Sequence, residues 1–168
     1  GSSEGTSLRA VSAEMKFIAD ASLAGLARWL RVCGYETVVF QGEAGRAMMR
    51  QALAGRRILL TRRRDMLERQ FPGRIVLMPV ADAGRQLKYV VEKLSLEVRR
   101  EKMLSLCLLC NELLEPLARE EVCDLVPPHV FENHEKFNRC RLCGRIYWEG
   151  SHIDRVFNFL EKNDIRIV

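Results

Sequence analysis

Short apolar runs alternate with amphipathic stretches along residues 16–94. Runs rich in branched or aromatic residues predict strands, and stretches with apolar positions every three or four residues predict helices. The expected strands are 16–20, 36–40, 57–61 and 74–78, and the expected helices are 22–33, 44–54, 64–70 and 83–94. Because a helix follows each strand, this order predicts a three-layer α/β domain, a parallel sheet with helices on both faces.

The pattern changes beyond residue 100. Two Cys-x-x-Cys motifs, a Pro-Pro pair at Pro127 and Pro128, and a strand-like run at 145–148 replace the regular alternation. A last helix is expected to begin at Ser151, whose side chain can cap it together with Asp154. We therefore expect a flexible leader or tag at 1–14, the α/β domain at 15–100, and a small module with a carboxy-terminal helix at 101–168.

The most specific pattern is the pair of Cys-x-x-Cys motifs, Cys107 with Cys110 and Cys140 with Cys143. Each motif forms a turn that presents two sulfurs toward one point, and Zn²⁺ favours four thiolates in a tetrahedron. These cysteines are therefore expected to bind zinc. A redox role for one pair would leave the other unexplained. A site closed by four cysteines has no open coordination position, so the expected role of the zinc is structural.

Positive charge is concentrated in the first predicted domain. Residues 15–100 hold 17 Lys and Arg against 8 Asp and Glu, whereas residues 101–168 hold 9 against 12. Such an excess favours a polyanionic partner, and nucleic acid before a membrane, because no basic amphipathic surface helix stands out. The alternative is a charged surface that serves only solubility.

Neither a membrane span nor a secretory signal is apparent. No apolar run approaches the length needed to cross a bilayer, and the first residues lack the apolar stretch of a signal peptide. The sequence therefore predicts a cytoplasmic protein without a membrane partner.

Acidic side chains follow each predicted strand: Asp20, Glu43, Asp65 and Asp82 in chain order. The carboxyl ends of parallel strands meet at one edge, where ligands gather, so we expect these carboxylates to converge on one rim. Carboxylate oxygens hold Mg²⁺ or Mn²⁺, which activates water and offsets the charge that builds on a phosphate. This arrangement predicts metal-dependent phosphodiester hydrolysis. Alternatively, acids at helix starts serve only as caps.

Five segments resemble successive motifs of one family. They are FIADASLAGLARWLRVCGYET, RILLTRRRDML, GRQLKYVVEKLSL, CLLCN and CRLCGRIYWEGSHIDRV, and they span about residues 16–160. The chain in this respect is similar to the Mut-seven C-terminal ribonuclease family. The resemblance implies a PIN-like ribonuclease domain followed by a zinc ribbon, with RNA as the substrate.

The resemblance bears on individual acids. Asp20 matches the family acid that ends the first strand, which implies a metal-binding role. The family's third strand ends in Thr-Arg-Asp, whereas this chain has Arg63 in the acid position and its carboxylate at Asp65. Whether Asp65 replaces the missing acid stays open. Glu43 and Asp82 match the supporting acids of PIN-like domains by location only.

Arginines near the same rim are expected to bind RNA phosphates. They are Arg28, Arg62, Arg63 and Arg64, with Arg56 and Arg57 beside them. Three functions remain in view. The first is a metal-dependent ribonuclease with a structural zinc ribbon. The second is an RNA-binding module with a degenerate nuclease site, which Arg63 motivates. The third is a toxin-like or partner-binding domain whose charge engages an acidic protein.

Overall fold

The computed structural model describes residues 15–149 and 151–168, and the predicted leader at 1–14 lies outside the described residues. The strands of its first sheet are β1 (Phe17–Asp20), β2 (Thr37–Phe40), β3 (Ile58–Thr61) and β4 (Ile75–Leu77). Their order is β2-β1-β3-β4, and every pairing is parallel. The predicted α/β fold with a parallel sheet is confirmed, and each strand lies within its expected range.

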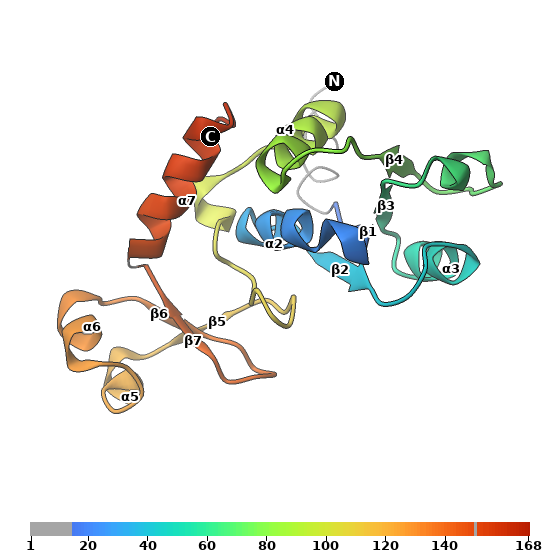
Figure 1. Cartoon of the computed structure of the whole chain (residues 1–168). Helices are drawn as coiled ribbons and strands as arrows, with labels where there is room; N and C mark the ends of the chain where they lie inside the picture. Colours follow the sequence, from blue (N-terminus) through green and yellow to red (C-terminus); the bar gives the residue numbers. More distant parts are fainter. Residues whose placement is uncertain (1–14, 150) are drawn as a thin grey trace, which may run out of the picture.

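Helices cover both faces of this sheet (Figure 1). One face carries α2 (Ala24–Val32), which follows the short 3-10 helix η1 (Ala21–Leu23), and α4 (Ala83–Leu94). The other face carries α3 (Arg46–Ala54) and the 3-10 helix η2 (Arg64–Glu68). The segment expected as a third helix is thus only a short 3-10 helix. Met66 is its sole buried residue, so no apolar stripe supports a longer α-helix there.

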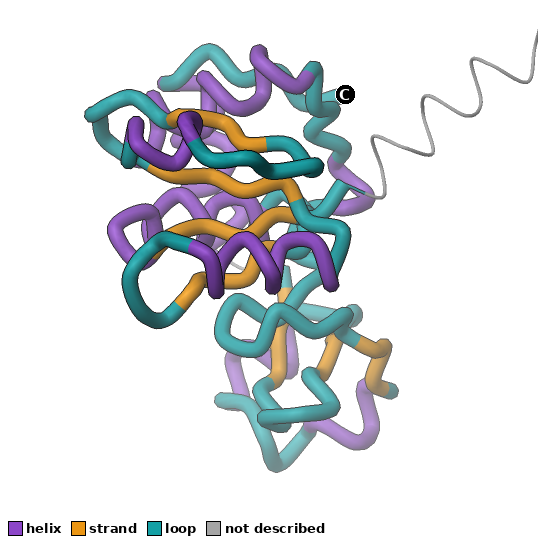
Figure 2. The backbone as a smooth tube through the Cα atoms, turned by 90° about the vertical axis from the view of Figure 1, so that its right-hand side faces the viewer, coloured by secondary structure: helices purple, strands orange, loops and turns teal. Residues whose placement is uncertain are grey.

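A second, smaller module follows the link that contains η3 (Arg100–Lys102). It consists of an antiparallel sheet and two short helices: β5 (Glu115–Leu117), α5 (Arg119–Val122), α6 (Pro128–Asn133), β6 (Phe137–Arg139) and β7 (Ile146–Trp148). Its own apolar core is formed by Leu117, Val122, Val126, Val130 and Phe137. Figure 2 shows the two groups of strands as separate bodies, with the parallel sheet above the smaller module.

The last helix, α7 (Ser151–Lys162), begins at the predicted residue but packs away from the small module. Val156 and Leu160 belong to the same buried cluster as the helices α2 and α4. The rings of Trp29 on α2 and Phe159 on α7 are stacked, with centroids 3.6 Å apart. The sequence grouped this helix with the zinc module, whereas it completes the core of the first domain (Figure 1).

Within the described ranges, no helix combines the length and apolar character that a bilayer crossing requires.

Candidate active site and metal centre

A hollow of about 590 Å³ opens at the carboxyl ends of β1, β2 and β3. Its walls come from the start of η1, the β2–α3 loop, the turn after β3 and the β4–α4 loop. They are formed by Asp20, Ala21, Ser22, Gly42, Glu43, Ala44, Arg62, Arg63 and Val80. Two acidic and two basic residues therefore line this hollow, at the edge of the sheet where a parallel α/β fold gathers its ligands.

Asp20 is the most constrained acid of the hollow, at 7% exposure. Its Oδ1 accepts hydrogen bonds from the backbone N–H and the hydroxyl of Ser22. Its Oδ2 accepts from Thr61 Oγ1 at 2.8 Å and from the Arg62 N–H at 3.4 Å. Two of these donors are hydroxyl groups, which can rotate away. The four contacts fix the carboxylate in position, and it can bind a cation when one of the two hydroxyl groups turns away.

Glu43 lines the same hollow from the β2–α3 loop and is exposed. Among the described residues it has no hydrogen-bond or ion-pair partner, so its side chain is free to turn toward a ligand. Mg²⁺ commonly takes one or two protein carboxylates and completes its six oxygen ligands with water and substrate phosphate. Asp20 and Glu43 fit that requirement.

Asp65, the possible substitute for the missing family acid, does not line the hollow. Its two carboxylate oxygens accept from Nε and Nη2 of Arg63 at 3.1 and 2.8 Å, and Arg69 lies 4.0 Å away. The hydrogen bond from Arg63 holds the pKa of the Asp65 carboxyl below its ordinary value. The structure therefore places Asp65 in an ion pair with the arginine that stands in the acid position.

Asp82 also lies outside the hollow. It caps α4, where its side chain accepts from the Arg85 N–H at 2.9 Å, and it forms an ion pair with Arg85. In the part of the chain that the structure describes, the only cluster of three or more Cys, His, Asp or Glu side chains able to share a metal ion is the four cysteines. The fold thus brings Asp20 and Glu43 to one hollow and leaves Asp65 and Asp82 on separate partners.

The predicted RNA-binding arginines also divide. Arg62 and Arg63 line the hollow, whereas Arg28 on α2 and Arg64 in η2 are exposed outside it. The Arg62 guanidinium has no hydrogen bond or ion pair within residues 15–149 and 151–168. Its charge therefore remains available to an anionic ligand.

Cys107, Cys110, Cys140 and Cys143 meet at one point, as the sequence predicts. Their Sγ atoms all lie within 4.8 Å of one another, and those of Cys107 and Cys143 are 3.8 Å apart. A tetrahedron with Zn–S bonds of about 2.3 Å has edges of about 3.8 Å. The four thiols can therefore hold a metal ion such as zinc.

Tyr147 on β7 adds a contact to this cluster that sequence reasoning missed. Its hydroxyl lies 3.2 Å from Cys107 Sγ and accepts from the Leu108 N–H at 3.3 Å. Burial raises the pKa of the Cys107 thiol, but hydrogen bonds from Tyr147 and from the backbone of Cys110 and Leu109 outweigh burial and lower it to about 6. Metal ligands bind as thiolates, so these donors favour the binding form.

The residue after each Cys-x-x-Cys motif closes its turn. Asn111 and Gly144 have left-handed φ angles of 58° and 75°, and the N–H of each donates to the carbonyl oxygen of the first cysteine at 2.9 Å. Asparagine and glycine are the residues that adopt this conformation most readily. This shared requirement is the sequence signal by which Asn111 could have been found.

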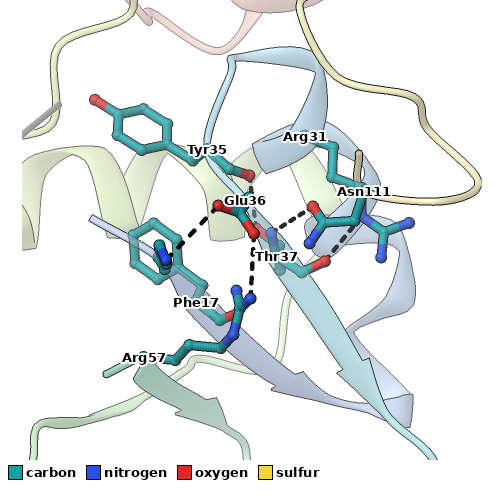
Figure 3. A network of polar contacts seen from close by, with 8 residues as sticks. Phe17, Arg31, Tyr35, Glu36, Thr37, Arg57 and Asn111 are labelled. Atoms are coloured by element: carbon teal, nitrogen blue, oxygen red, sulfur yellow. Dashed lines mark hydrogen bonds and ion pairs between the residues drawn. The ribbon is translucent and has the colours of Figure 1, made fainter. Parts of the chain in front are cut away.

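The first turn is also attached to the edge of the parallel sheet (Figure 3). Asn111 Oδ1 accepts from the Thr37 N–H at 2.8 Å, at the start of the edge strand β2. Arg31 on α2 donates to the carbonyl oxygens of Thr37 and Leu108 at 2.8 and 2.7 Å. In the same view Glu36 pairs with Arg57, away from Asn111. The turn formed by Cys107, Cys110 and Asn111 is therefore joined to the first domain by side-chain hydrogen bonds to backbone groups.

Asn111→Gly should lower the free energy of unfolding by about 1 kcal/mol, because the buried Thr37 N–H loses its acceptor. Glycine tolerates the left-handed angle, so this variant removes the amide oxygen without backbone strain. Asn111→Ala should cost about 1 kcal/mol more, because it adds that strain. Chemical denaturation of the metal-loaded variants measures both values. Equal stability of wild type and Asn111→Gly would mean that the contact to Thr37 contributes nothing.

Comparison with known families agrees with this architecture. The family model described as the Mut7-C RNAse domain matches residues 15–160, nearly all of the described chain. This α/β protein, with acidic and basic residues around one hollow and four clustered cysteines that could hold a metal ion, belongs to the Mut7-C RNAse domain family. No curated protein and no solved structure matches the chain.

Proposed function

We propose that this chain is a metal-dependent ribonuclease that hydrolyses RNA phosphodiester bonds in the hollow beside Asp20. The observation that carries the proposal is the pairing of two acids, Asp20 and Glu43, with Arg62 and Arg63 in one hollow at the carboxyl edge of the sheet. Membership of an RNAse domain family supports the same reaction class.

Each residue has a role that follows from its contacts. Asp20 is fixed by Ser22 and Thr61, so it would hold a divalent cation at a defined place, and the exposed Glu43 would complete the protein ligands. Bound Mg²⁺ or Mn²⁺ would activate water and offset negative charge on the phosphate. Arg62 and Arg63 bind the RNA backbone next to that position.

The four cysteines hold zinc in this proposal, and its role is structural. Four thiolates fill the tetrahedral positions of Zn²⁺ and leave none for a water nucleophile. The zinc then fixes the two Cys-x-x-Cys turns, one of which contacts β2 through Asn111.

A second candidate function is RNA binding without hydrolysis. The observation that favours it is the Arg63–Asp65 ion pair, which places a cation where the family acid is expected and holds the nearest substitute outside the hollow. In this case Arg62 and Arg63 would bind RNA phosphates. Asp20 would only stabilise the turns after β1 and β3, through its hydrogen bonds with the N–H groups of Ser22 and Arg62.

Adding Mg²⁺ or Mn²⁺ to the zinc-loaded protein distinguishes a ribonuclease from a protein that only binds RNA. For a ribonuclease we expect single-stranded RNA to be cut only after the metal is added, because two carboxylates alone supply no activated water. A chelator too weak to remove the zinc should stop the cleavage. Gel analysis of labelled RNA measures the products. RNA that is bound but stays intact at every metal concentration would favour the second function.

A further inference from the structure

The guanidinium of Arg63 is held on two sides by different parts of the chain. Its Nε and Nη2 donate to the two carboxylate oxygens of Asp65 at 3.1 and 2.8 Å. Its Nη1 donates to the carbonyl oxygen of Ala44, in the β2–α3 loop, at 2.8 Å. Three hydrogen bonds to two segments fix the plane of a side chain that is otherwise flexible.

This arrangement leaves part of the guanidinium available. Arginine has five N–H donors, of which three are used here, so one on Nη1 and one on Nη2 remain. Both lie on edges of the guanidinium that do not face Asp65, because Asp65 takes the Nε and Nη2 edge. The side chain of Arg63 is 45% exposed and lines the hollow, so an incoming anion can reach it.

The backbone of Arg63 is also connected to Asp20. The Arg63 N–H donates to Thr61 Oγ1 at 3.1 Å, and that hydroxyl donates to Asp20 Oδ2 at 2.8 Å. The backbone of Arg63 and the buried acid are thus linked by two hydrogen bonds through Thr61. Arg62 differs, because its guanidinium has no partner in the described part of the chain and must be ordered when a ligand binds.

We propose that Arg63 is a pre-organised binding group for an RNA backbone phosphate, and that Asp65 is the positioning residue that holds it in place. The proposal rests on the proposed binding of RNA in this hollow, and it gives Asp65 a role different from that of a metal ligand. It also explains how a cation can stand at the acid position and still serve a site that acts on RNA. At that position the guanidinium of Arg63 is always positively charged and can attract the phosphate.

The proposal predicts that removal of an acidic charge weakens RNA binding. Removal of an acidic charge beside an RNA site ordinarily strengthens binding, because the acid repels phosphate. Asp65→Asn should instead weaken binding, because it releases the Arg63 guanidinium and restores the entropy cost of ordering it. Glu68→Gln is the matched control, since Glu68 is an exposed acid in the same 3-10 helix and lies outside the hollow.

The experiment is fluorescence anisotropy of a short labelled single-stranded RNA, with zinc-loaded protein and no added Mg²⁺ or Mn²⁺. Arg63→Ala should weaken binding about tenfold and lower the slope of log K against log salt by about 0.7, the value for one phosphate contact on a single strand. Asp65→Asn should weaken binding about threefold, and Glu68→Gln should leave it equal or slightly tighter. In the Arg63→Ala background, Asp65→Asn should cause no further loss.

Equal or tighter RNA binding by Asp65→Asn overturns the proposal, as does a wild-type protein that does not bind RNA at all. Asp65 is exposed, and thermal unfolding of the variant verifies that the fold is retained. Failure of the proposed hydrolysis gives a different result. Wild-type protein that binds RNA without cutting it contradicts hydrolysis and leaves the role of Arg63 intact, whereas cleavage together with unchanged binding by Asp65→Asn contradicts only the positioning of Arg63 by Asp65.

Discussion

Asp20→Asn is expected to lower the rate of RNA cleavage by more than about hundredfold, because a direct metal ligand should matter at least as much as the outer-shell partners whose loss costs 10- to 100-fold. The variant removes the negative charge from the one acid that the fold holds rigidly in the hollow. Single-turnover cleavage at saturating protein measures the chemical step separately from RNA binding.

The fold should survive this substitution. An asparagine can place its amide oxygen toward Ser22, which keeps both hydrogen bonds there, and its amide nitrogen toward Thr61, whose hydroxyl can turn and accept. Only the long contact to the Arg62 N–H is lost, so we expect a cost of about 1 kcal/mol. Asp124→Asn, an exposed acid of the small module, is the control and should cut RNA normally. Full cleavage by Asp20→Asn would remove Asp20 from the mechanism.

Cys107→Ser is expected to abolish zinc binding and to unfold the small module while the parallel sheet stays folded. Structural zinc contributes roughly 10–16 kcal/mol in small zinc-binding peptides. The module's own core has five buried residues, Leu117, Val122, Val126, Val130 and Phe137, with Phe131, Ile146 and Trp148 partly buried against them, and a core of this size is too small to fold the module without such a contribution. Zinc content and hydrogen exchange of residues 105–149 measure the effect, with α2 and α4 as protected references.

Cys123→Ser serves as the matched control, because Cys123 is exposed and lies outside the cysteine cluster. It should retain zinc and normal exchange. Retention of zinc and of protected amides by Cys107→Ser would show that the metal does not stabilise the module.

Much of this fold follows from local sequence pattern. The four strands of the parallel sheet consist mostly of branched and apolar residues, and the pattern is clearest in the central strands β1 and β3, which are buried on both faces. The cysteine cluster was equally predictable, because the spacing of each pair already defines its turn. A hollow lies at the carboxyl edge of the sheet, where a parallel topology brings its loops together, and Asp20 and Glu43 line it.

Which acidic side chains line the hollow could not be predicted, because the sequence does not show which partner each acid binds. Asp65 has two neighbouring arginines, and the bidentate pair with Arg63 keeps it outside the hollow. Asp82 caps α4 by accepting a hydrogen bond from the Arg85 N–H, which is the role that an acid before a helix most often has. The Ser22 contact to Asp20 could have been anticipated, because an aspartate two residues before a serine forms a local side-chain turn.

The stacking of Trp29 against Phe159 has a consequence for how the chain is made. In the chain, α7 follows the small module, so the helix whose Phe159 stacks on Trp29 is translated after both α2 and that module. Until then that surface can attract other nascent chains or a chaperone, since domains with incomplete cores expose apolar surface during synthesis. A fragment that ends before residue 151 would lack this cover, so such fragments should be cleared by proteolysis even when the carboxyl edge of their parallel sheet is intact.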